Sequence, residues 1–416
     1  MNRNTPPLPR RLTAAVAEAL AGFPVVVVTG ARQTGKSTLI HELLKTPRRE
    51  YHSLDDIDVL ERAEAEPDAL VSAAAPLTFD EIQRSPKLLH AVKRAVDRDR
   101  RPGRFLLSGS ANLALLGSVS ESLAGRAVYL TLYPFTYAER RGRGGTGPWD
   151  GILEDPGAFE GEHEPIAGLD AELLGGGFPP VVLAADRAQH RAWLKGYVRT
   201  YLERDLQMLA SIHNLVDFRR LMRMAALRTG ALLNQSELSR DAGLAQPTAH
   251  RYLNLLEASY LLHRLPAYAV NRTKRLVKSP KLYFCDSGLA AHLAGIETPA
   301  GLESSALKGP LLESLVLGDL LAWRETAAPG AEILYWRSVS GDEVDFVIER
   351  GSKVFPVEVK MTGRPRPADF KSLRVFLDEY GKAAPHAVLV HTGRKAERLA
   401  DRIWGIPLSA ALGAAG

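Results

Sequence analysis

Residues 25–40 read VVVVTGARQTGKSTLI, and this stretch decides the fold of the first part of the chain. Four consecutive valines after Pro24 are typical of a strand buried in a parallel sheet, and residues 36–44 have the apolar spacing of a helix. Between them, residues 30–37 match GxxxxGK[ST], the pattern of a phosphate-binding loop that joins a strand to a helix. Because the strand and the helix are both indicated, we interpret the loop as a nucleotide site rather than as an ordinary glycine-rich turn.

Each residue type in this loop has a physical reason to bind a triphosphate. Glycines let the backbone wrap around a phosphate, and the following helix presents unpaired N–H groups. Lys36 supplies positive charge, and the Ser37 hydroxyl is a suitable ligand for Mg²⁺. We therefore predict ATP and Mg²⁺ as cofactors. The residues expected to contact ATP are Gly30, Ala31, Arg32, Gln33, Thr34, Gly35, Lys36, Ser37 and Thr38.

An acidic pair, Asp80 and Glu81, follows a short apolar run in the segment PLTFDE. Behind a phosphate-binding loop, the first acid is predicted to hold Mg²⁺ together with Ser37, and the second to orient an attacking water. Hydrolysis of ATP is then the expected reaction. The alternative is that two acids after a short strand begin an ordinary helix.

Further polar residues follow the next apolar run, in the segment FLLSGSAN. They would emerge at the carboxyl edge of the sheet, beside the phosphates, so Ser110 and Asn112 are predicted to contact the nucleotide, with Ser108 next to them. Arg126, at the end of SESLAGR, is a candidate to neutralise charge in the transition state, within its own subunit or across a subunit boundary. The alternative is a surface arginine near a turn.

Helical and strand-like segments alternate up to about residue 137, which is typical of a doubly wound α/β sheet. The predicted helices are 11–21, 36–44 and 86–97, and the predicted strands are 25–28, 77–79, 104–107 and 127–132. Residues 140–168 are rich in Gly, Pro and acids without periodicity, so we expect a flexible, peripheral loop there. Residues 186–265 read as almost wholly helical, and strands return at 332–336, 343–349, 353–360 and 386–391.

The motifs GARQTGKST, LTFDEIQ, LLSGSAN and SLAGR, followed by GGFPP at 176–180 and TYLERDL at 200–206, resemble those of bacterial AAA+-type ATPases that carry a C-terminal domain of unknown function. The resemblance covers nearly the whole chain, although residues 140–168 have no counterpart in it. It implies an AAA+-like core, an arginine-finger role for Arg126 and assembly into a homo-oligomer.

Residues 234–258 are predicted to form a helix, a tight turn at Gly243 and a second helix. A capping box of Asn234 and Glu237 would start the first helix, and the second has an apolar stripe that includes Tyr252 and Leu256. Two strand-like pieces, 260–265 and 281–284, flank a basic stretch that resembles the wing of a winged helix. The residues predicted to contact DNA are His250, Arg251, Arg272, Lys274 and Arg275. The alternative is a helical module that contacts only protein.

The segment GDEVDFVIERGSKVFPVEVK, residues 341–360, places Asp345 on one strand and Glu358 with Lys360 on the next. Residues two apart on a strand share a face, so two carboxylates and a lysine would meet there. The pattern is similar to that of PD-(D/E)XK nucleases, without the proline before the first acid. Asp345, Glu358 and Glu313 are then candidate metal ligands, with Lys360 beside them. The alternative is a set of cross-strand ion pairs.

Composition bounds these hypotheses. The chain has 416 residues, 53 Lys and Arg, 48 Asp and Glu, and a formal net charge of +5, which permits contact with DNA without requiring it. A single cysteine, Cys285, excludes an internal disulfide and a cysteine-rich zinc site, and no run is long enough to span a membrane. We therefore expect a cytoplasmic ATPase that acts with DNA, or alternatively a nucleotide-dependent switch that binds a protein partner.

Four segments are expected from these patterns. They are an AAA+-like core at 1–140, a Gly-rich insertion with a helical lid segment at 141–215, a winged-helix-like segment at 216–300 and a PD-(D/E)XK-like α/β domain at 301–416.

Overall fold

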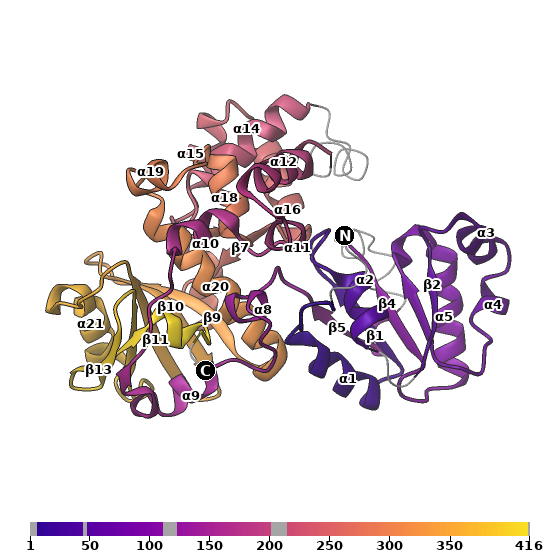
Figure 1. Cartoon of the computed structure of the whole chain (residues 1–416), viewed down its shortest axis with the longest axis horizontal. Coiled ribbons are helices and arrows are strands. Elements are labelled where there is room, and N and C mark those ends of the chain that lie inside the picture. Colours follow the sequence, from indigo (N-terminus) through magenta and orange to yellow (C-terminus); the bar gives the residue numbers. More distant parts are fainter. Residues whose placement is uncertain (1–5, 45–47, 111–122, 201–213, 415–416) are drawn as a thin grey trace. The chain divides into compact units, whose positions relative to one another are not determined.

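A computed structural model describes residues 6–44, 48–110, 123–200 and 214–414 (Figure 1). The chain divides into two compact units. The first comprises Met1–Phe135 with Gly142–Gly145 and Ala258–Tyr260, and the second comprises the rest. No helix in the described ranges is long and apolar enough to cross a membrane.

The first unit is built on a five-stranded sheet whose neighbouring strands all pair in parallel. The strand order is β2-β3-β4-β1-β5, with bounds β1 Val25–Thr29, β2 Glu50–Ser53, β3 Leu77–Asp80, β4 Phe105–Ser108 and β5 Ala127–Thr131. The predicted α/β class and parallel core are therefore confirmed. The strand β2 was not predicted, because its residues EYHS form no apolar run and none of them is fully buried.

The valines of β1 are buried on both faces of this sheet. Val25 and Val27 belong to one apolar core, and Val26 and Val28 belong to the other, because successive side chains of a strand point to opposite faces. The helix α5 (Pro86–Arg98) packs in the first core and α1 (Leu12–Gly22) in the second, so the sheet lies between helical layers (Figure 1). A strand covered on both sides must be apolar throughout, and the run of valines is a consequence of this.

The remaining helices of the first unit are short. The predicted helix 36–44 is a single α-helical turn that continues as a π-helix. The helices α3 and α4 lie between β2 and β3 along the chain. The bounds are α2 Lys36–Thr38, π-helix Leu39–Leu43, α3 Ile57–Ala65, α4 Pro67–Leu70 and a 3₁₀ turn Ile82–Arg84.

Most of the Gly-rich stretch 140–168 belongs to the second unit, and there the expectation of a peripheral loop is wrong. Trp149, Ile152 and Leu153 are buried on one side of a short helix, and the Trp149 indole N–H donates to Asp319 Oδ1 at 3.0 Å. A helix of six residues is too short to show a period in the sequence. The elements are α8 Tyr137–Arg140, α9 Trp149–Glu154, a 3₁₀ turn Pro156–Phe159 and β6 Gly161–Glu162.

A helical layer follows, with one small hairpin of strands. The predicted helix, turn and helix are confirmed as α15 and α16, with Gly243 at a positive φ of 64° in the turn. The bounds are α10 Leu169–Gly175, α11 Pro179–Val182, α12 Arg187–Tyr197, α14 Leu215–Ala226, α15 Gln235–Asp241, α16 Gln246–Ala258, β7 Leu262–Leu265, α17 Arg272–Val277, β8 Lys281–Phe284, α18 Ser287–Ala294 and α19 Pro299–Glu303.

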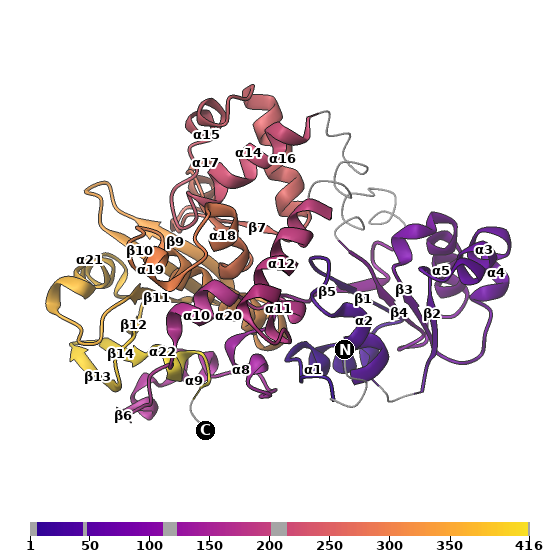
Figure 2. The same cartoon turned by 45° about the horizontal axis from the view of Figure 1, so that its top comes forward.

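The C-terminal part is a mixed seven-stranded sheet of order β6-β13-β14-β12-β11-β10-β9, accompanied by α20 and α21 (Figure 2). The four strands predicted from the sequence are confirmed as β9, β10, β11 and β12. The bounds are α20 Lys308–Ala327, β9 Glu332–Arg337, β10 Glu343–Arg350, β11 Lys353–Lys360, a 3₁₀ turn Pro367–Phe370, α21 Lys371–Tyr380, β12 Ala387–His391, β13 Lys395–Ala400, β14 Ile403–Pro407 and α22 Leu408–Ala411.

Candidate functional site

The sheet of the first unit gathers the predicted nucleotide residues at one edge. The strand β4 lies between β1 and β3, so the ends of three neighbouring parallel strands meet there. The phosphate-binding loop follows β1, Ser108 ends β4 and Asp80 ends β3. The carboxyl edge of a parallel sheet is the usual ligand position of such folds. The interposed strand was not predictable from the order of the motifs along the chain.

The loop itself requires glycine at two positions. Gly30 has a φ of 140° and Gly35 a φ of 93°, both in the region that other residues rarely adopt. A Cβ atom on Gly30 would also overlap the backbone carbonyl of Leu132. The amides of Ala31, Thr34 and Gly35 have no hydrogen-bond acceptor among the described residues. Unsatisfied N–H groups beside a helix start form a cradle suited to an anion.

Lys36 is folded back into this loop. Its side chain is 5% exposed, and Nζ donates to the carbonyls of Gly30 at 3.2 Å and Ala31 at 2.9 Å. Burial lowers the pKa of Lys36 to about 8, and the nearby charges of Glu81 and Asp80 oppose this effect. The ammonium is therefore held by neutral carbonyl groups, and phosphate oxygens would solvate it better.

Asp80 is buried and oriented by two hydroxyl groups. Tyr51 donates to Oδ2 at 2.8 Å, and Ser108 donates to Oδ1. The Ser37 hydroxyl, at the start of α2, is exposed. A carboxylate and a hydroxyl are the hard oxygen ligands that Mg²⁺ prefers, and phosphate oxygens would supply the remainder of an octahedral set. Ser37 and Asp80 therefore fit the predicted metal.

Glu81 has a strained backbone, with a φ of 55° in the left-handed region. Its carboxylate accepts a hydrogen bond from the Gln83 amide, which also donates to Ser110 Oγ at 3.1 Å. Burial raises the pKa of Glu81. Gln83 thus positions Glu81 and links it to Ser110, a role that the sequence reasoning did not assign. Asn112 lies outside the described residues.

Arg126 is engaged in a bidentate ion pair at the end of α5. Its Nε lies 2.6 Å from Asp97 Oδ1, its NH2 lies 3.1 Å from Asp97 Oδ2, and NH1 donates to the Ala124 carbonyl. An arginine finger in the same or a neighbouring subunit would have to exchange this pair for a phosphate.

Arg10 is a residue of the site that the sequence reasoning missed. NH1 donates to the Thr34 carbonyl at 2.7 Å, and NH2 donates to the Tyr133 carbonyl at 2.6 Å. The guanidinium also lies 4.4 Å from the centre of the Phe135 ring, and the residue is 6% exposed. Arg10 therefore joins the phosphate-binding loop to the chain after β5. Both carbonyls lie far from Arg10 along the chain, so its position in the sequence gives no indication of this role.

Replacing Arg10 by Met is expected to weaken ATP binding about tenfold, because two buried carbonyls lose a charged donor and the loop loses its attachment. Titration calorimetry with a non-hydrolysable ATP analogue measures the effect. The control is Arg98→Met, at an exposed arginine in α5. Equal affinity in the two variants would show that Arg10 does not position the loop.

The structure brings the predicted nuclease-like residues together in the second unit. Asp345 on β10 and Glu358 on β11 are buried, and Lys360 Nζ lies 2.6 Å from Glu358 Oε1. Glu313 on α20 accepts a hydrogen bond from Tyr283 OH at 2.7 Å. Burial, followed by the charge of Asp345, raises the pKa of Glu313 to about 7 and that of Glu358 to about 8.

A second lysine, Lys281 on β8, lies within this cluster and was not predicted. It is 2% exposed, and Nζ lies 2.6 Å from Glu343 Oε1, 3.2 Å from Asp345 Oδ1 and 3.7 Å from Glu313 Oε2. Across the described ranges, no group of three or more His, Cys, Asp or Glu residues is placed to hold a metal ion. The location of Lys281 in a predicted strand gives no indication of these acidic partners.

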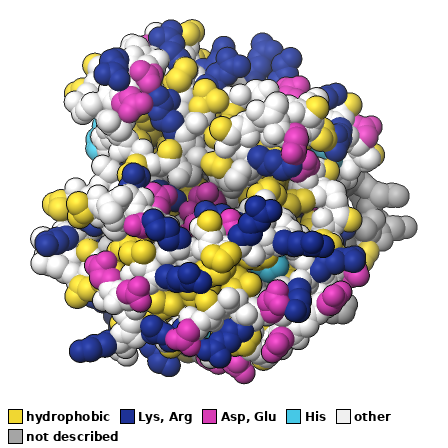
Figure 3. All heavy atoms as spheres, turned by 90° about the vertical axis from the view of Figure 1, so that its left-hand side faces the viewer, with side chains coloured by type: hydrophobic (Ala, Val, Ile, Leu, Met, Phe, Trp, Pro, Cys, Tyr) yellow, Lys and Arg dark blue, Asp and Glu magenta, His cyan; other side chains and the backbone are white. Residues whose placement is uncertain are grey.

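The predicted DNA contacts divide into two sets. His250, Arg251, Arg272 and Lys274 are exposed. Arg275 is 7% exposed and pairs with Glu349 and Glu332, so it is wrongly placed on a DNA-binding wing. The basic stretch is the helix α17 rather than a loop, because Asn271 caps its first turn. On the face drawn in Figure 3, basic side chains are interspersed with acidic and apolar ones.

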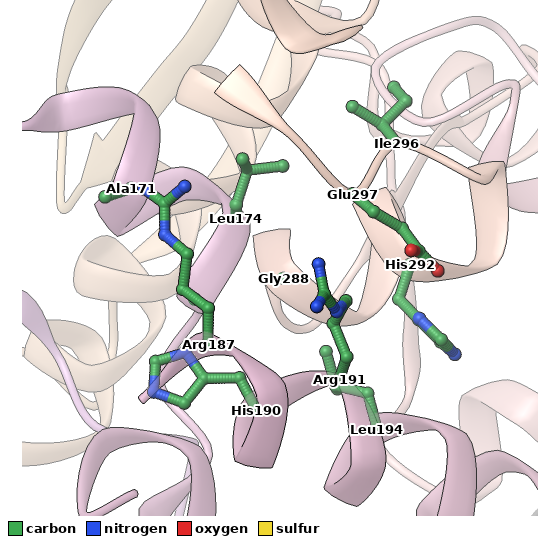
Figure 4. A pocket seen from close by; sticks show the side chains of 11 residues that line it. Ala171, Leu174, Arg187, His190, Arg191, Leu194, Gly288, His292, Ile296 and Glu297 are labelled. Atoms are coloured by element: carbon green, nitrogen blue, oxygen red, sulfur yellow. The ribbon is translucent and has the colours of Figure 1, made fainter. Parts of the chain in front are cut away.

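The GGFPP segment has a structural explanation. Gly176 has a φ of 70°, and a Cβ atom on it would overlap the carboxylate of Asp286. Asp286 accepts a hydrogen bond from the Gly177 N–H and also caps α18. Next to this close approach, a pocket that the sequence did not predict lies between α10, α12 and α18, with Arg187, Arg191 and Glu297 in its wall (Figure 4).

Three domain families match successive parts of the chain. An AAA domain matches residues 22–140, a domain of unknown function (DUF8612) matches 166–300 and another (DUF4143) matches 308–411. The parallel sheet, the phosphate-binding loop and the AAA match together define an AAA-type P-loop ATPase.

Similar proteins cover nearly the full length. The chain is 32% identical over 399 residues to the uncharacterized protein Rv2008c of Mycobacterium tuberculosis, covering 96% of this chain and 83% of that protein. An uncharacterized protein of Haemophilus influenzae is 21% identical over 382 residues, covering 86% and 88% of the two chains. The Walker-type ATPase PABY2304 of Pyrococcus abyssi is a structural neighbour with 16% identity and a TM-score of 0.45, covering 69% of this chain and 98% of that chain. The chain belongs to the same family as the mycobacterial protein.

Proposed function

We propose that the protein hydrolyses ATP in a Mg²⁺-dependent reaction at the edge of the parallel sheet. The observation that carries the proposal is that Lys36, in the loop after β1, lies at the same edge of the sheet as Asp80, which ends β3, and Glu81, which follows it. A buried cation, a metal-binding carboxylate and an acid that orients water are the parts that phosphoryl transfer needs.

Each residue has a defined role in this proposal. The amides of the loop and Lys36 bind the phosphates and neutralise charge as the terminal phosphoryl group leaves. Ser37 and Asp80 would hold Mg²⁺, which supplies further charge neutralisation on the phosphates. Glu81, held by Gln83, accepts a hydrogen bond from the attacking water and places it in line. Arg126 is proposed to leave its ion pair with Asp97 and to contact the phosphates of ATP bound to a neighbouring subunit of a homo-oligomer.

We further propose that ATP turnover is coupled to DNA binding in a cytoplasmic setting, with the four segments described from the sequence as working parts. The support is the helix-turn-helix pair α15 and α16, whose second helix buries Tyr252 and Leu253 and leaves His250 and Arg251 exposed. Exposed cations beside such a helix suit phosphate contacts, which position a protein on DNA.

DNA is expected to increase the ATPase rate several-fold, and the triple variant Arg251→Ala, Arg272→Ala, Lys274→Ala is expected to lose this increase, because phosphate contacts dominate DNA affinity. The measurement is steady-state hydrolysis with single- and double-stranded DNA across a salt series, with sizing in ATP and in ADP. The control removes three exposed basic residues elsewhere, Arg98, Arg364 and Lys382. DNA response in the triple variant equal to that of the wild-type chain would contradict the assignment.

The second candidate function is a nucleotide-dependent switch that binds a protein partner and has no nuclease activity. The ion pairs of Lys281 and Arg275 favour it, because they engage residues that a DNA-processing protein would keep available. A rate of ATP hydrolysis that does not change with DNA at any salt concentration would favour this switch over the DNA-coupled enzyme.

A further inference from the structure

The resemblance of residues 341–360 to a nuclease motif implies a metal, and the acids of this cluster can be tested for whether they fit one. Both oxygens of Asp345 are used, Oδ1 by Lys281 Nζ at 3.2 Å and Oδ2 by the Val359 N–H at 3.0 Å. Both oxygens of Glu358 are used as well, Oε1 by Lys360 and Oε2 by the Asp345 N–H at 3.3 Å. A divalent ion needs ligand oxygens that converge on one point, whereas the oxygens of Asp345 and Glu358 face separate donors within the protein.

The point where the carboxylates converge is taken by the ammonium group of Lys281. Glu343 and Asp345 approach it from β10, and Glu313 approaches it from α20. Three acids therefore surround one cation, and that cation is a side chain of the protein itself. The residues therefore do not fit a bound metal while Lys281 is present.

The backbone of β8 determines the position of Lys281. The strand pairs with β7 in the register Leu265 to Lys281, and an isolated bridge joins Lys281 to Leu232. The backbone of Lys281 is thus paired on both sides, and only 2% of the residue is exposed. An ammonium group buried at this depth requires charged partners, and the three acids supply them.

We propose that Lys281 takes the place of the metal ion in this nuclease-like domain, which makes the cluster a metal-free ion-pair joint. The joint fastens the β7–β8 hairpin to the sheet of β9, β10 and β11. The acidic residues that resemble those of a nuclease centre thereby serve to attach the hairpin to the sheet.

Other contacts between the same elements agree with an attachment role. Arg275, on the helix between β7 and β8, pairs with Glu349 of β10 and Glu332 of β9. Tyr335 of β9 pairs by backbone hydrogen bonds with the chain after β7, through Pro266 and Tyr268. The hairpin is thus held to the sheet by two buried cations and a short backbone ladder, and Lys281 is the more deeply buried of the two cations.

Mn²⁺ titration of the full chain without nucleotide tests the proposal. An Asp80→Asn background removes the metal ligand of the ATP site, so that binding reports on the second unit alone. This background is expected to bind no Mn²⁺ in the second unit. The added change Lys281→Ala frees three carboxylates and is expected to increase Mn²⁺ affinity by at least about tenfold. The further change Asp345→Asn is expected to abolish the gain.

Two results would overturn the proposal. One is Mn²⁺ binding by the Asp80→Asn chain that is lost on Asp345→Asn. The other is a folded Lys281→Ala chain, with wild-type far-UV and near-UV circular dichroism, that gains no Mn²⁺ binding. If Lys281→Ala does not fold, the chains that keep Lys281 decide the matter, because Mn²⁺ binding that depends on Asp345 contradicts the proposal and its absence supports it.

The attachment role has its own readout. Hydrogen exchange at the amides of β8 and β10 is expected to become at least about tenfold faster in Lys281→Ala, since removing one partner leaves buried carboxylates uncompensated. Unchanged exchange there would contradict the attachment role. Because these measurements use no ATP, their failure is distinguishable from failure of the proposed ATPase activity.

Discussion

Replacement of Lys36 by Met is expected to abolish ATP binding and, at the same time, to increase the free energy of unfolding of the nucleotide-free protein. Loss of the ammonium removes the charged donor to the phosphates, which should weaken ATP binding at least about a hundredfold. The gain in stability arises because burial removes the ammonium from water and lowers the pKa of Lys36 from 10.5 to about 8. The binding function of Lys36 is thus expected to reduce stability in the absence of ligand.

The pH dependence of this effect has a definite sign. A lysine whose pKa falls from 10.5 to about 8 on folding binds fewer protons in the folded state than in the unfolded state between these values. The free energy of unfolding of the wild-type chain should therefore rise with pH across this window. Lys36→Met should be more stable than wild type by about 3 kcal/mol at pH 7, and the difference should disappear above about pH 10.5.

Urea unfolding of both chains at pH 7, 8, 9 and 10 measures this difference. The control is Lys382→Met, at an exposed lysine in the second unit, which should leave both stability and its pH dependence unchanged. A Lys36→Met chain that is no more stable than wild type at pH 7 would show that burial of the ammonium carries no cost. Titration calorimetry with ATP and Mg²⁺ separately tests the predicted loss of ATP binding.

Glu81→Gln is expected to reduce ATP turnover by about 10²–10⁴-fold while ATP affinity stays within about twofold of wild type, because a general base acts on the reacting water and not on bound phosphate. The glutamine side chain has nearly the shape of glutamate and can still accept the hydrogen bond from Gln83, so its position is kept. A loss of turnover then reports on the missing negative charge. Single-turnover hydrolysis and calorimetry measure the two quantities.

The matched control for this prediction is Glu66→Gln, an exposed glutamate of the same unit whose replacement should leave turnover unchanged. Wild-type turnover in Glu81→Gln would remove Glu81 from the reaction and would leave ordinary helix initiation as the explanation of the acidic pair. Loss of ATP binding together with turnover would indicate a structural role for Glu81.

The nucleotide site shows which features can be predicted from residues that are close together in the sequence. The strand, the glycine loop and the helix of residues 25–40 are contiguous, so one short stretch of sequence is enough to predict phosphate binding. The neighbours of that stretch come from elsewhere in the chain: Arg10 from before α1, and Tyr51 and Gln83 around the acidic pair. No periodicity links these residues to the loop, since their contacts depend on sheet order.

In the C-terminal cluster, by contrast, the decisive residue is distant in the sequence from the residues that were grouped. Asp345, Glu358 and Lys360 were grouped correctly from strand alternation, and the structure places them together. The residue that changes their interpretation is Lys281, which lies on a different strand pair, β7 and β8, and meets Asp345 only in the tertiary structure. Similarly, Arg275 was read as a solvent-facing base on a wing, whereas a helix cap at Asn271 directs it toward Glu349.

The sequence by itself determined the class of the first unit, the identity of the phosphate loop and acidic pair, the helix-turn-helix and the four main strands of the C-terminal sheet. These features depend on residues that are close along the chain, where steric preference, side-chain alternation and capping act directly. Only the tertiary structure decided which cation meets which acid, because an ion pair between distant strands leaves no period or spacing in the sequence. For this reason the loop predicts ATP chemistry on its own, whereas the ion pairs of Lys281 with Glu313, Glu343 and Asp345 become apparent only in the tertiary structure.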